Sequence, residues 1–309
     1  FDKNSGVPFY EPYLLDEKMA QEPTYFEIDF LVFGTRYRYS FSYTGQEIVS
    51  EEFAIYASNK EAVLYSRQQG QDINSMTLGG LLRGKRRKIA FMPNQLYFSV
   101  AANVEGGPAV IADVWNVLNY ASINLDNLLL PWRTNFLLSN ENGQHKLLRF
   151  LKAAGTGIES LSVEKNDEQL LSSMYNALNP YERLKMIEAN KYKIRCGHIN
   201  RQGGMTYFDL ANESVGSARF LWLIGHIYYA LLRGEVLVID ELNNSLHPQL
   251  AEFLVELFND PEINANNAQL IFSTHDITLM NPAYMRRDQL FFVDKDADGA
   301  SELYSLDAF

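Results

Sequence analysis

A short apolar run, Val236-Leu237-Val238-Ile239, constrains the fold of this 309-residue chain more than any other feature. Four consecutive aliphatic residues are typical of a strand covered on both faces, as in a parallel sheet packed between helices. The run ends in Asp240-Glu241, so two acids follow the carboxyl end of the strand. Because open α/β sheets bind ligands at that edge, the sequence predicts an α/β fold with a candidate site there.

A second apolar strand, Leu270–Phe272, is followed by Ser273-Thr274-His275-Asp276. If both strands belong to one sheet, His275 lies at the same edge as the acids, where it is suited to a polar contact with a γ-phosphate. A surface or capping role is the alternative for a histidine in a loop. Between the strands stands Leu246-His247-Pro248, and Pro248 suits the first turn of a helix that continues through Phe258.

The segment from Glu213 to Arg219, Glu-Ser-Val-Gly-Ser-Ala-Arg, precedes an apolar helix predicted over Phe220–Leu232. Hydroxyls and backbone N–H groups at a helix start can bind an anion, with the positive end of the helix dipole behind them. The alternative is a plain cap, in which Ser214 or Ser217 bonds the first turn. The apolar stretch has thirteen residues, fewer than the roughly 20 that cross a bilayer, so we expect a buried helix and no membrane contact.

The N-terminal part alternates aromatic or β-branched residues with polar ones, which predicts an antiparallel meander. Its four strands are expected at Thr24–Phe33, Arg36–Tyr43, Glu47–Tyr56 and Ala62–Arg67. Apolar residues then recur at helical spacing between Ala109 and Ala154, with a break near Pro131. We therefore predict an antiparallel β lobe over 1–68, a connector and helical lobe over 69–155, and a site-bearing part over 156–309.

The site-bearing part begins with further elements that the pattern indicates. They are a short strand at Glu159–Val163, a long helix over Glu168–Ala189 interrupted at Pro180, and a hairpin of Lys191–His198 with Met205–Leu210. Proline interrupts a helix because it lacks the backbone N–H and clashes with the preceding turn.

Charge and cysteine content limit the class of protein. The chain has 27 Lys and Arg against 38 Asp and Glu, a net charge of −11, which excludes a surface that is basic throughout and grips nucleic acid. The local run Arg83-Gly84-Lys85-Arg86-Arg87-Lys88 is either a solvated face or a contact for a phosphate backbone. A single cysteine, Cys196, allows no internal disulfide and no paired zinc ligands, so a reducing, cytoplasmic location is expected.

Two further patterns imitate known motifs. The segment Gly79–Lys85 has the glycine and lysine spacing of a phosphate loop, but Arg86 replaces the hydroxyl residue and no buried strand precedes it. The acids Asp294, Asp296 and Asp298 resemble the opening of a calcium loop, yet Ser305 stands where the bidentate glutamate is required. We interpret the first as a decoy and the second as a solvated turn between two strands.

The order of these elements is a serine-glycine turn with its helix, a strand ending in two acids, Leu-His-Pro, and a strand followed by histidine. This order resembles the carboxyl half of an ABC-type ATPase head. Chromosome-maintenance ATPases, double-strand-break repair ATPases and overcoming-lysogenization-defect nucleases share that head. The chain is most similar to bacterial AAA15-type ATPases, from about Pro12 to its end. The similar segments are Pro23–Glu27, Arg36–Tyr39, Asn94–Ser99, Gly157–Glu159 and Arg287–Leu290.

The resemblance implies ATP and Mg²⁺ as cofactors and assigns roles to individual residues. Asp240 matches the Walker B aspartate that supports Mg²⁺, Glu241 the glutamate that activates water, and His275 the switch histidine. The remaining matches are Ser214 and Gly216 in the signature turn, which reaches the ATP of a second subunit, and Leu246 and His247 in the D-loop at the dimer interface. Val215, which replaces a carboxylate, and Ser217-Ala218 depart from the family pattern, although Ser217 remains a candidate ATP-binding residue.

The resemblance also implies a phosphate loop, Gly-x-x-x-x-Gly-Lys followed by Ser or Thr, upstream of the meander. None stands there, so we expect that the sequence begins and ends inside a longer protein. The implied function is an ATP-hydrolysing head that forms a homodimer or higher homo-oligomer around ATP. It would gate an effector, a nuclease or toxin, in bacterial antiphage defence. The alternatives are a DNA-repair or DNA-clamping ATPase and an ATP-stabilised scaffold with slow hydrolysis.

Overall fold

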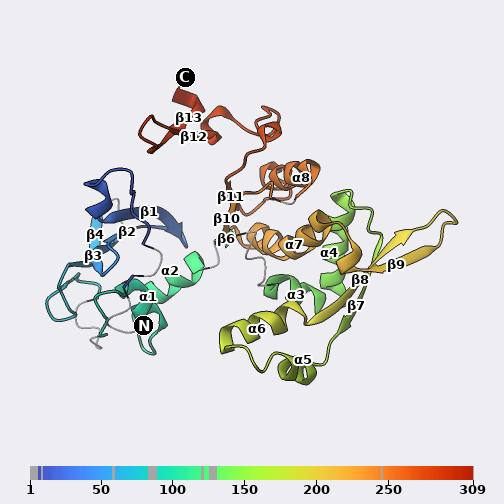
Figure 1. Cartoon of the computed structure of the whole chain (residues 1–309), viewed down its shortest axis with the longest axis horizontal. Coiled ribbons are helices and arrows are strands. Elements are labelled where there is room, and N and C mark those ends of the chain that lie inside the picture. Colours follow the sequence, from blue (N-terminus) through green and yellow to red (C-terminus); the bar gives the residue numbers. More distant parts are fainter. Residues whose placement is uncertain are drawn as a thin grey trace. The chain divides into compact units, whose positions relative to one another are not determined.

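The computed structural model describes residues 6–7, 10–57, 60–82, 89–119, 122–124, 131–244 and 246–308. Contacts between residues group the chain into two compact units (Figure 1). The first unit comprises Phe1–Asn119 with Val293–Glu302, and the second comprises Tyr120–Phe292 with Leu303–Phe309. The division into three parts inferred from the sequence stays a prediction.

An antiparallel sheet forms the framework of the first unit. Its strands follow one another in the order β1 (Thr24–Val32), β2 (Thr35–Tyr43), β3 (Ile48–Tyr56), β4 (Glu61–Gln68) and β5 (Thr77–Leu78). The predicted meander is confirmed, with the ends of its four strands correct to within one residue. The two-residue strand β5 was not predicted because it lies in a polar connector and forms only by pairing with β4.

Two helices, α1 (Tyr97–Asn103) and α2 (Ala109–Asn119), complete the core of the first unit. Aromatic side chains dominate this core, and Phe53 and Tyr65 are fully buried in it. The Tyr39 and Phe98 rings stack with their centroids 4.6 Å apart, which joins β2 to α1. The alternating aromatic pattern of the meander therefore supplies the apolar face on which the helices pack.

Parallel strands form the sheet that carries the predicted site in the second unit. The order is β11 (Gln269–Phe272), β10 (Val236–Asp240), β6 (Ser122–Asn124), and β10 is parallel to both neighbours. The α/β class and the parallel pairing of β10 with β11 are confirmed. However, the meander and the β7-β8-β9 sheet are antiparallel, and β12 and β13 form a short two-stranded sheet. The described residues therefore do not show the mainly parallel architecture that was predicted.

The burial of this parallel sheet also differs from the prediction. Leu237 and Ile239 are fully buried, but Val236 and Val238 are only half-buried. Ile271, the neighbour of Val238 on β11, is 56% exposed. Within the described residues, therefore, one face of the sheet is covered and the other only partly, although the apolar run predicted cover on both faces.

Helix α7 (Val215–Arg233) is the central helix of the second unit. It begins five residues before the predicted start because its first turn is polar and the apolar run alone missed it. By length and composition α7 could cross a bilayer, but ten of its 19 residues are buried in the protein core. Its Gly225 allows close approach of α3 (Trp132–Leu138), since a Cβ there would lie 2.4 Å from the Thr134 backbone nitrogen.

Further helices surround α7. Helix α4 (Glu141–Ala153) packs on α3 and α7, and α8 (Pro248–Asn259) contacts β11. The predicted long helix is two helices, α5 (Glu168–Met174) and α6 (Pro180–Ala189). Asn179 caps α6 and Pro180 occupies its first turn, so the predicted interruption is confirmed, although α5 ends earlier than expected.

The remaining strands form two small sheets. β7 (Ser160–Lys165), β8 (Tyr192–Ile199) and β9 (Met205–Asp209) make an antiparallel sheet that includes the predicted hairpin. β12 (Phe291–Lys295) and β13 (Ser301–Ser305) pair through a turn in which Asp296 Oδ1 accepts hydrogen bonds from the Asp298 and Ala300 amides. The Asp296 carboxylate thus holds its own turn, as the interpretation of a solvated turn requires.

Short 3₁₀ helices fill several connections. They are η1 (Met19–Gln21), η3 (Leu210–Asn212), η4 (Ile277–Leu279), η5 (Arg287–Gln289) and η6 (Leu306–Ala308). Of these, η3 leads directly into the predicted signature turn, and η4 follows His275.

Candidate functional site

A serine hydroxyl joins the ends of the two predicted site strands. In the parallel register Ile239 pairs with Phe272, so the next residues, Asp240 and Ser273, stand side by side at the carboxyl edge. Ser273 Oγ donates to Asp240 Oδ1 at 2.5 Å and accepts from the Glu241 amide at 2.8 Å. The backbone of Leu242 also donates to the Ser273 carbonyl at 2.9 Å. These bonds fix both acids relative to β11.

Glu241 adopts a backbone conformation that is rare for a residue with a side chain. Its φ is +51°, in the left-handed region, and its carbonyl accepts a hydrogen bond from the Asn244 amide at 2.7 Å. Such conformations cost free energy and occur often at functional sites. The Glu241 side chain is 51% exposed, so the turn presents this carboxylate to solvent rather than to the core.

His275 lies beside Glu241, as the sequence predicted for the edge of one sheet. Its Nε2 is 3.8 Å from Glu241 Oε1, and its side chain is 84% exposed. This separation exceeds a hydrogen bond, and catalytic contacts are often longer before substrate binds. Asp240, Glu241 and His275 are thus brought together, while their chemical roles remain predictions.

Asn243 positions the segment that carries His275, a role that the sequence analysis missed. Its Oδ1 accepts from Thr274 Oγ1 at 2.9 Å and from the His275 amide at 3.2 Å. Ser273 was also not assigned a role. A usable signal was available in both cases, because short polar side chains follow the strand ends, Ser273 directly after β11 and Asn243 three residues after β10, where they can bond backbone groups nearby.

The predicted signature turn starts α7 in the manner of a helix cap. Ser214 is the N-cap residue, and its Oγ accepts from the Ser217 amide at 3.0 Å and donates to Ser217 Oγ at 2.9 Å. Ser214 is exposed, Gly216 is half-buried and Ser217 is buried. The capping alternative therefore describes these contacts, and an exposed hydroxyl at a helix N-terminus stays compatible with an anion.

One hydrogen bond links α7 to the loop after Glu241. Arg219 Nη1 donates to the Asn244 carbonyl at 3.1 Å. Farther along the same loop, His247 is the N-cap of α8, its Nδ1 lies 3.4 Å from the Gln249 amide, and Pro248 occupies the first turn as predicted. The imidazole of His247 is exposed, so the structure gives it a capping contact and leaves its predicted interface role untested.

Titration properties distinguish two groups near these elements. Burial, with a smaller effect of the Glu213 carboxylate, raises the pKa of Cys196 to about 12, so this thiol is not a nucleophile at neutral pH. Hydrogen bonds from the Thr278 hydroxyl and amide lower the pKa of Asp276, which caps η4 directly after His275. Asp276 is therefore an anion that shapes the loop directly after His275.

The donor groups at the sheet edge suit Mg²⁺ bound with a phosphate rather than a metal held by protein alone. Among the described residues, no cluster of three or more His, Cys, Asp or Glu side chains can hold a metal ion. Mg²⁺ commonly takes one or two carboxylates and completes its shell with water and phosphate oxygens. Asp240, held by the Ser273 hydroxyl, supplies the carboxylate that this arrangement needs.

The first unit supplies no phosphate loop among its described residues. Gly79 donates its amide to the Leu64 carbonyl at 2.8 Å, so the decoy segment begins by packing on β4. Residues 83–85 of that segment, and with them the whole basic run at 83–88, lie outside the described residues. Nothing in the structure therefore tests the proposed contact between this run and a phosphate backbone.

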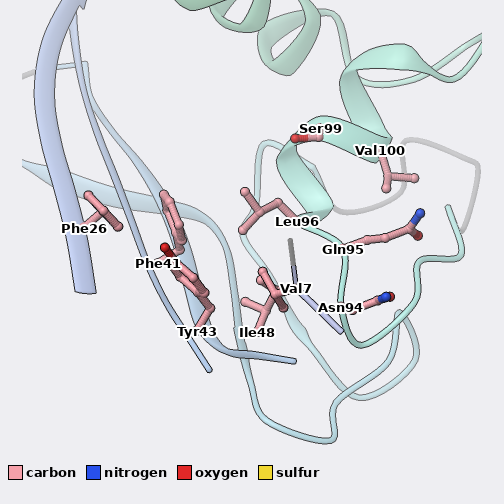
Figure 2. A pocket seen from close by; sticks show the side chains of 10 residues that line it. All are labelled: Val7, Phe26, Phe41, Tyr43, Ile48, Asn94, Gln95, Leu96, Ser99 and Val100. Carbon is pink, nitrogen blue, oxygen red and sulfur yellow. The ribbon is translucent and has the colours of Figure 1, made fainter. Parts of the chain in front are cut away.

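A separate hollow of about 460 Å³ lies in the first unit (Figure 2). Phe26, Phe41 and Tyr43 form one side, and Leu96 and Val100 lie across from them with the Asn94 and Gln95 amides. The ten described residues that line it are uncharged. Such a lining does not provide for a triphosphate or a metal ion, so the sheet edge is the candidate functional site.

Two parallel strands followed by Asp-Glu and Ser-Thr-His, in the same unit as a long helix with a serine cap, are features expected of an AAA or ABC-type ATPase domain. A family model described as "AAA domain, putative AbiEii toxin, Type IV TA system" matches residues 118–281, slightly more than half of the chain. The chain belongs to this family of nucleotide-binding, ATPase-type AAA domains. A search of curated proteins finds no match.

Proposed function

We propose that this protein is an AAA15-type ATPase with an ABC-type head that hydrolyses ATP with Mg²⁺. One observation carries the proposal: the Ser273 hydroxyl bonds both the Asp240 carboxylate and the Glu241 amide, and His275 lies beside Glu241. The family match supports nucleotide binding for the same part of the chain, because residues 118–281 include β10, α7 and β11. AAA15 membership and the residue roles rest on the sequence motifs.

The chain's own residues divide the work of hydrolysis. Asp240, oriented by Ser273, would hold Mg²⁺, which when bound neutralises charge on the phosphate oxygens. Glu241 orients a water molecule and accepts its proton, and its left-handed backbone keeps the carboxylate facing solvent. His275 donates from Nε2 to the γ-phosphate, and Asn243 holds the His275 backbone for that contact.

Dimerisation is part of the proposal. Ser214, Gly216 and Ser217 at the start of α7 complete the ATP site of a second subunit, and His247 lies at the interface between subunits. Two observations support this: Ser214 and His247 are both exposed, and the start of α7 presents the positive end of a 19-residue helix. ATP then favours the closed dimer because its γ-phosphate makes contacts that only this state offers, and hydrolysis releases it.

The output of the ATP cycle follows from the resemblance. We propose a cytoplasmic homodimer or higher homo-oligomer that gates a nuclease or toxin effector in bacterial antiphage defence. A DNA-repair or DNA-clamping ATPase, with the 83–88 run as the DNA contact, and a scaffold that hydrolyses ATP slowly are the alternatives. Single-turnover hydrolysis distinguishes the scaffold from an enzyme that cycles.

Substitution of Glu241 tests the proposed function. In the full-length protein, we expect Glu241→Gln to lower the ATP hydrolysis rate at least about 100-fold, because the amide cannot accept a proton from water. We also expect ATP-bound dimers to accumulate, measured by size-exclusion chromatography with light scattering. Glu256→Gln, on the exposed side of α8, is the matched control. Hydrolysis by Glu241→Gln at the unaltered rate would show that the assigned role is wrong.

A further inference from the structure

We propose that His198 is a positioning residue for the signature turn, an inference that rests on the proposed function of that turn. His198 Nε2 lies 2.8 Å from Oε1 of Glu213, the residue immediately before the N-cap Ser214. Because a carboxylate only accepts hydrogen bonds, Nε2 carries the proton and donates. Strand β8 is thus joined directly to the peptide that leads into α7.

The Glu213 side chain is too buried to be held by solvent. It is 9% exposed, and that of His198 is 28% exposed. A carboxylate in such surroundings requires a hydrogen-bond donor, and a charge-assisted bond of this length fixes its orientation. Glu213 itself has an extended backbone between η3 and α7. Because the Glu213 side chain is fixed, the turn that follows it has fewer accessible conformations.

His198 is well placed to fix another group because its own strand is rigid. The next residue back, Gly197, lies against β7 so closely that a Cβ would be 2.1 Å from Ser160 Oγ. Its carbonyl accepts from the Glu159 amide at 2.8 Å, and the His198 ring packs edge-on against Phe208 of β9 at 5.8 Å. The backbone that carries His198 is therefore held on the β7 side through Gly197, and its imidazole is held by Phe208 of β9.

The direction of the Glu213 carboxylate also matters electrostatically. The turn beginning at Ser214 is proposed to receive the γ-phosphate of the opposite subunit's ATP. A carboxylate one residue away would repel that anion if it faced the helix start. The bond to His198 holds it toward the β7-β8-β9 sheet instead. His198 thereby keeps the Glu213 charge away from the start of α7, where the phosphate is proposed to bind.

The test compares two substitutions of His198 in the full-length protein. His198→Phe keeps an aromatic ring against Phe208 but removes the donor, and His198→Gln keeps a donor at a similar reach. We expect His198→Phe to lower kcat at least about tenfold and to raise by a similar factor the ATP concentration needed for dimers in the Glu241→Gln background. ATP affinity of the monomer should not change, since the turn contacts ATP only across the dimer.

His198→Gln should recover most of kcat and of dimer formation, which a role limited to packing would not explain. His145→Leu, at an exposed position on α4, is the control for loss of a histidine. Thermal unfolding and circular dichroism verify that each variant is folded. If His198→Phe does not fold, His198→Asn takes its place, because its shorter side chain cannot reach Glu213 as glutamine does.

The possible outcomes distinguish failure of the positioning role of His198 from failure of the proposed ATPase function. If the unaltered protein hydrolyses ATP and dimerises but His198→Phe, or His198→Asn in its place, matches it, the positioning role is overturned and the ATPase stands. If loss of the donor weakens ATP binding to the monomer instead of dimerisation, the positioning role is also overturned. If the unaltered protein neither hydrolyses ATP nor dimerises with it, the proposed function itself fails.

Discussion

Glu51 is a carboxylate buried in the core of the first unit, with 1% of its surface exposed. It accepts hydrogen bonds from the Tyr39 and Tyr65 hydroxyls, from Arg67 Nε at 2.8 Å and from the amides of Tyr97 and Phe98. Five donors from β2, β4 and α1 therefore meet at one side chain of β3. These hydrogen bonds offset the desolvation free energy of burying both charges of the Glu51–Arg67 pair.

Removing this charge should destabilise the unit strongly. We expect Glu51→Gln to lower the free energy of unfolding by about 3 kcal/mol, because the Arg67 guanidinium stays buried without its counter-charge. Urea denaturation followed by circular dichroism measures the change. Glu27→Gln is the matched control, since Glu27 pairs with Arg38 at 3.8 Å on an exposed face of the same sheet. Equal midpoints for the two variants would contradict this account of Glu51.

At the scale of elements, the periodicity of the sequence predicted most strands and helices. The meander, the β8–β9 hairpin and the pairing of β10 with β11 followed from alternation, turn residues and the continuous apolar run. The three-residue strand β6 did not, because so short a segment has no period and exists through its pairing with β10. Elements that depend on a distant partner lack a local signal.

The candidate site shows the same limit. The acids and His275 were predicted because each follows a recognisable apolar strand. Ser273 and Asn243, which hold them in place, were not predicted, since hydrogen bonds from Ser273 to Asp240 and from His275 to Asn243 depend on the register of two strands more than 30 residues apart. The left-handed conformation of Glu241 was equally hidden, because it arises from the tight turn ending at Asn244.

The contact between α7 and α3 gives a prediction at this scale. Alanine forms helices better than glycine by up to about 1 kcal/mol, yet we expect Gly225→Ala to lower the free energy of unfolding by about 1–3 kcal/mol. The added methyl group would lie 2.4 Å from the Thr134 backbone and hydroxyl, so one helix must shift. Urea denaturation of the purified variant measures the change in the free energy of unfolding. A variant more stable than the unaltered protein would show that α3 and α7 accommodate the methyl group without cost.

For the whole molecule, buried tyrosines set the response of stability to alkaline pH. Desolvation, and then the Glu51 charge, raise the pKa of Tyr39 and of Tyr65 well above 10.0. Both phenols stay protonated in the folded state where the unfolded chain has begun to ionise. Their contribution to stability is therefore complete below pH 10.0 and is lost as pH rises beyond it.

We expect the free energy of unfolding to fall as pH rises above about 10, the unfolded pKa of tyrosine. Tyr39→Phe and Tyr65→Phe should each make the fall less steep, because each removes a phenol that ionises only on unfolding. Urea denaturation at a series of pH values provides the measurement. If the free energy of unfolding fell equally steeply with pH in the unaltered protein and both variants, that result would count against the raised pKa of Tyr39 and Tyr65.

The hydroxyl of Ser273 joins two residues, Asp240 and Glu241, to which the proposed function gives different roles. One oxygen is bonded both to the Asp240 carboxylate and to the peptide nitrogen of Glu241. A displacement of the Asp240 carboxylate would therefore be passed through that oxygen to the backbone of Glu241. Under the proposed roles, the residue that would hold the cation and the residue that would activate water therefore share one hydrogen-bonding atom.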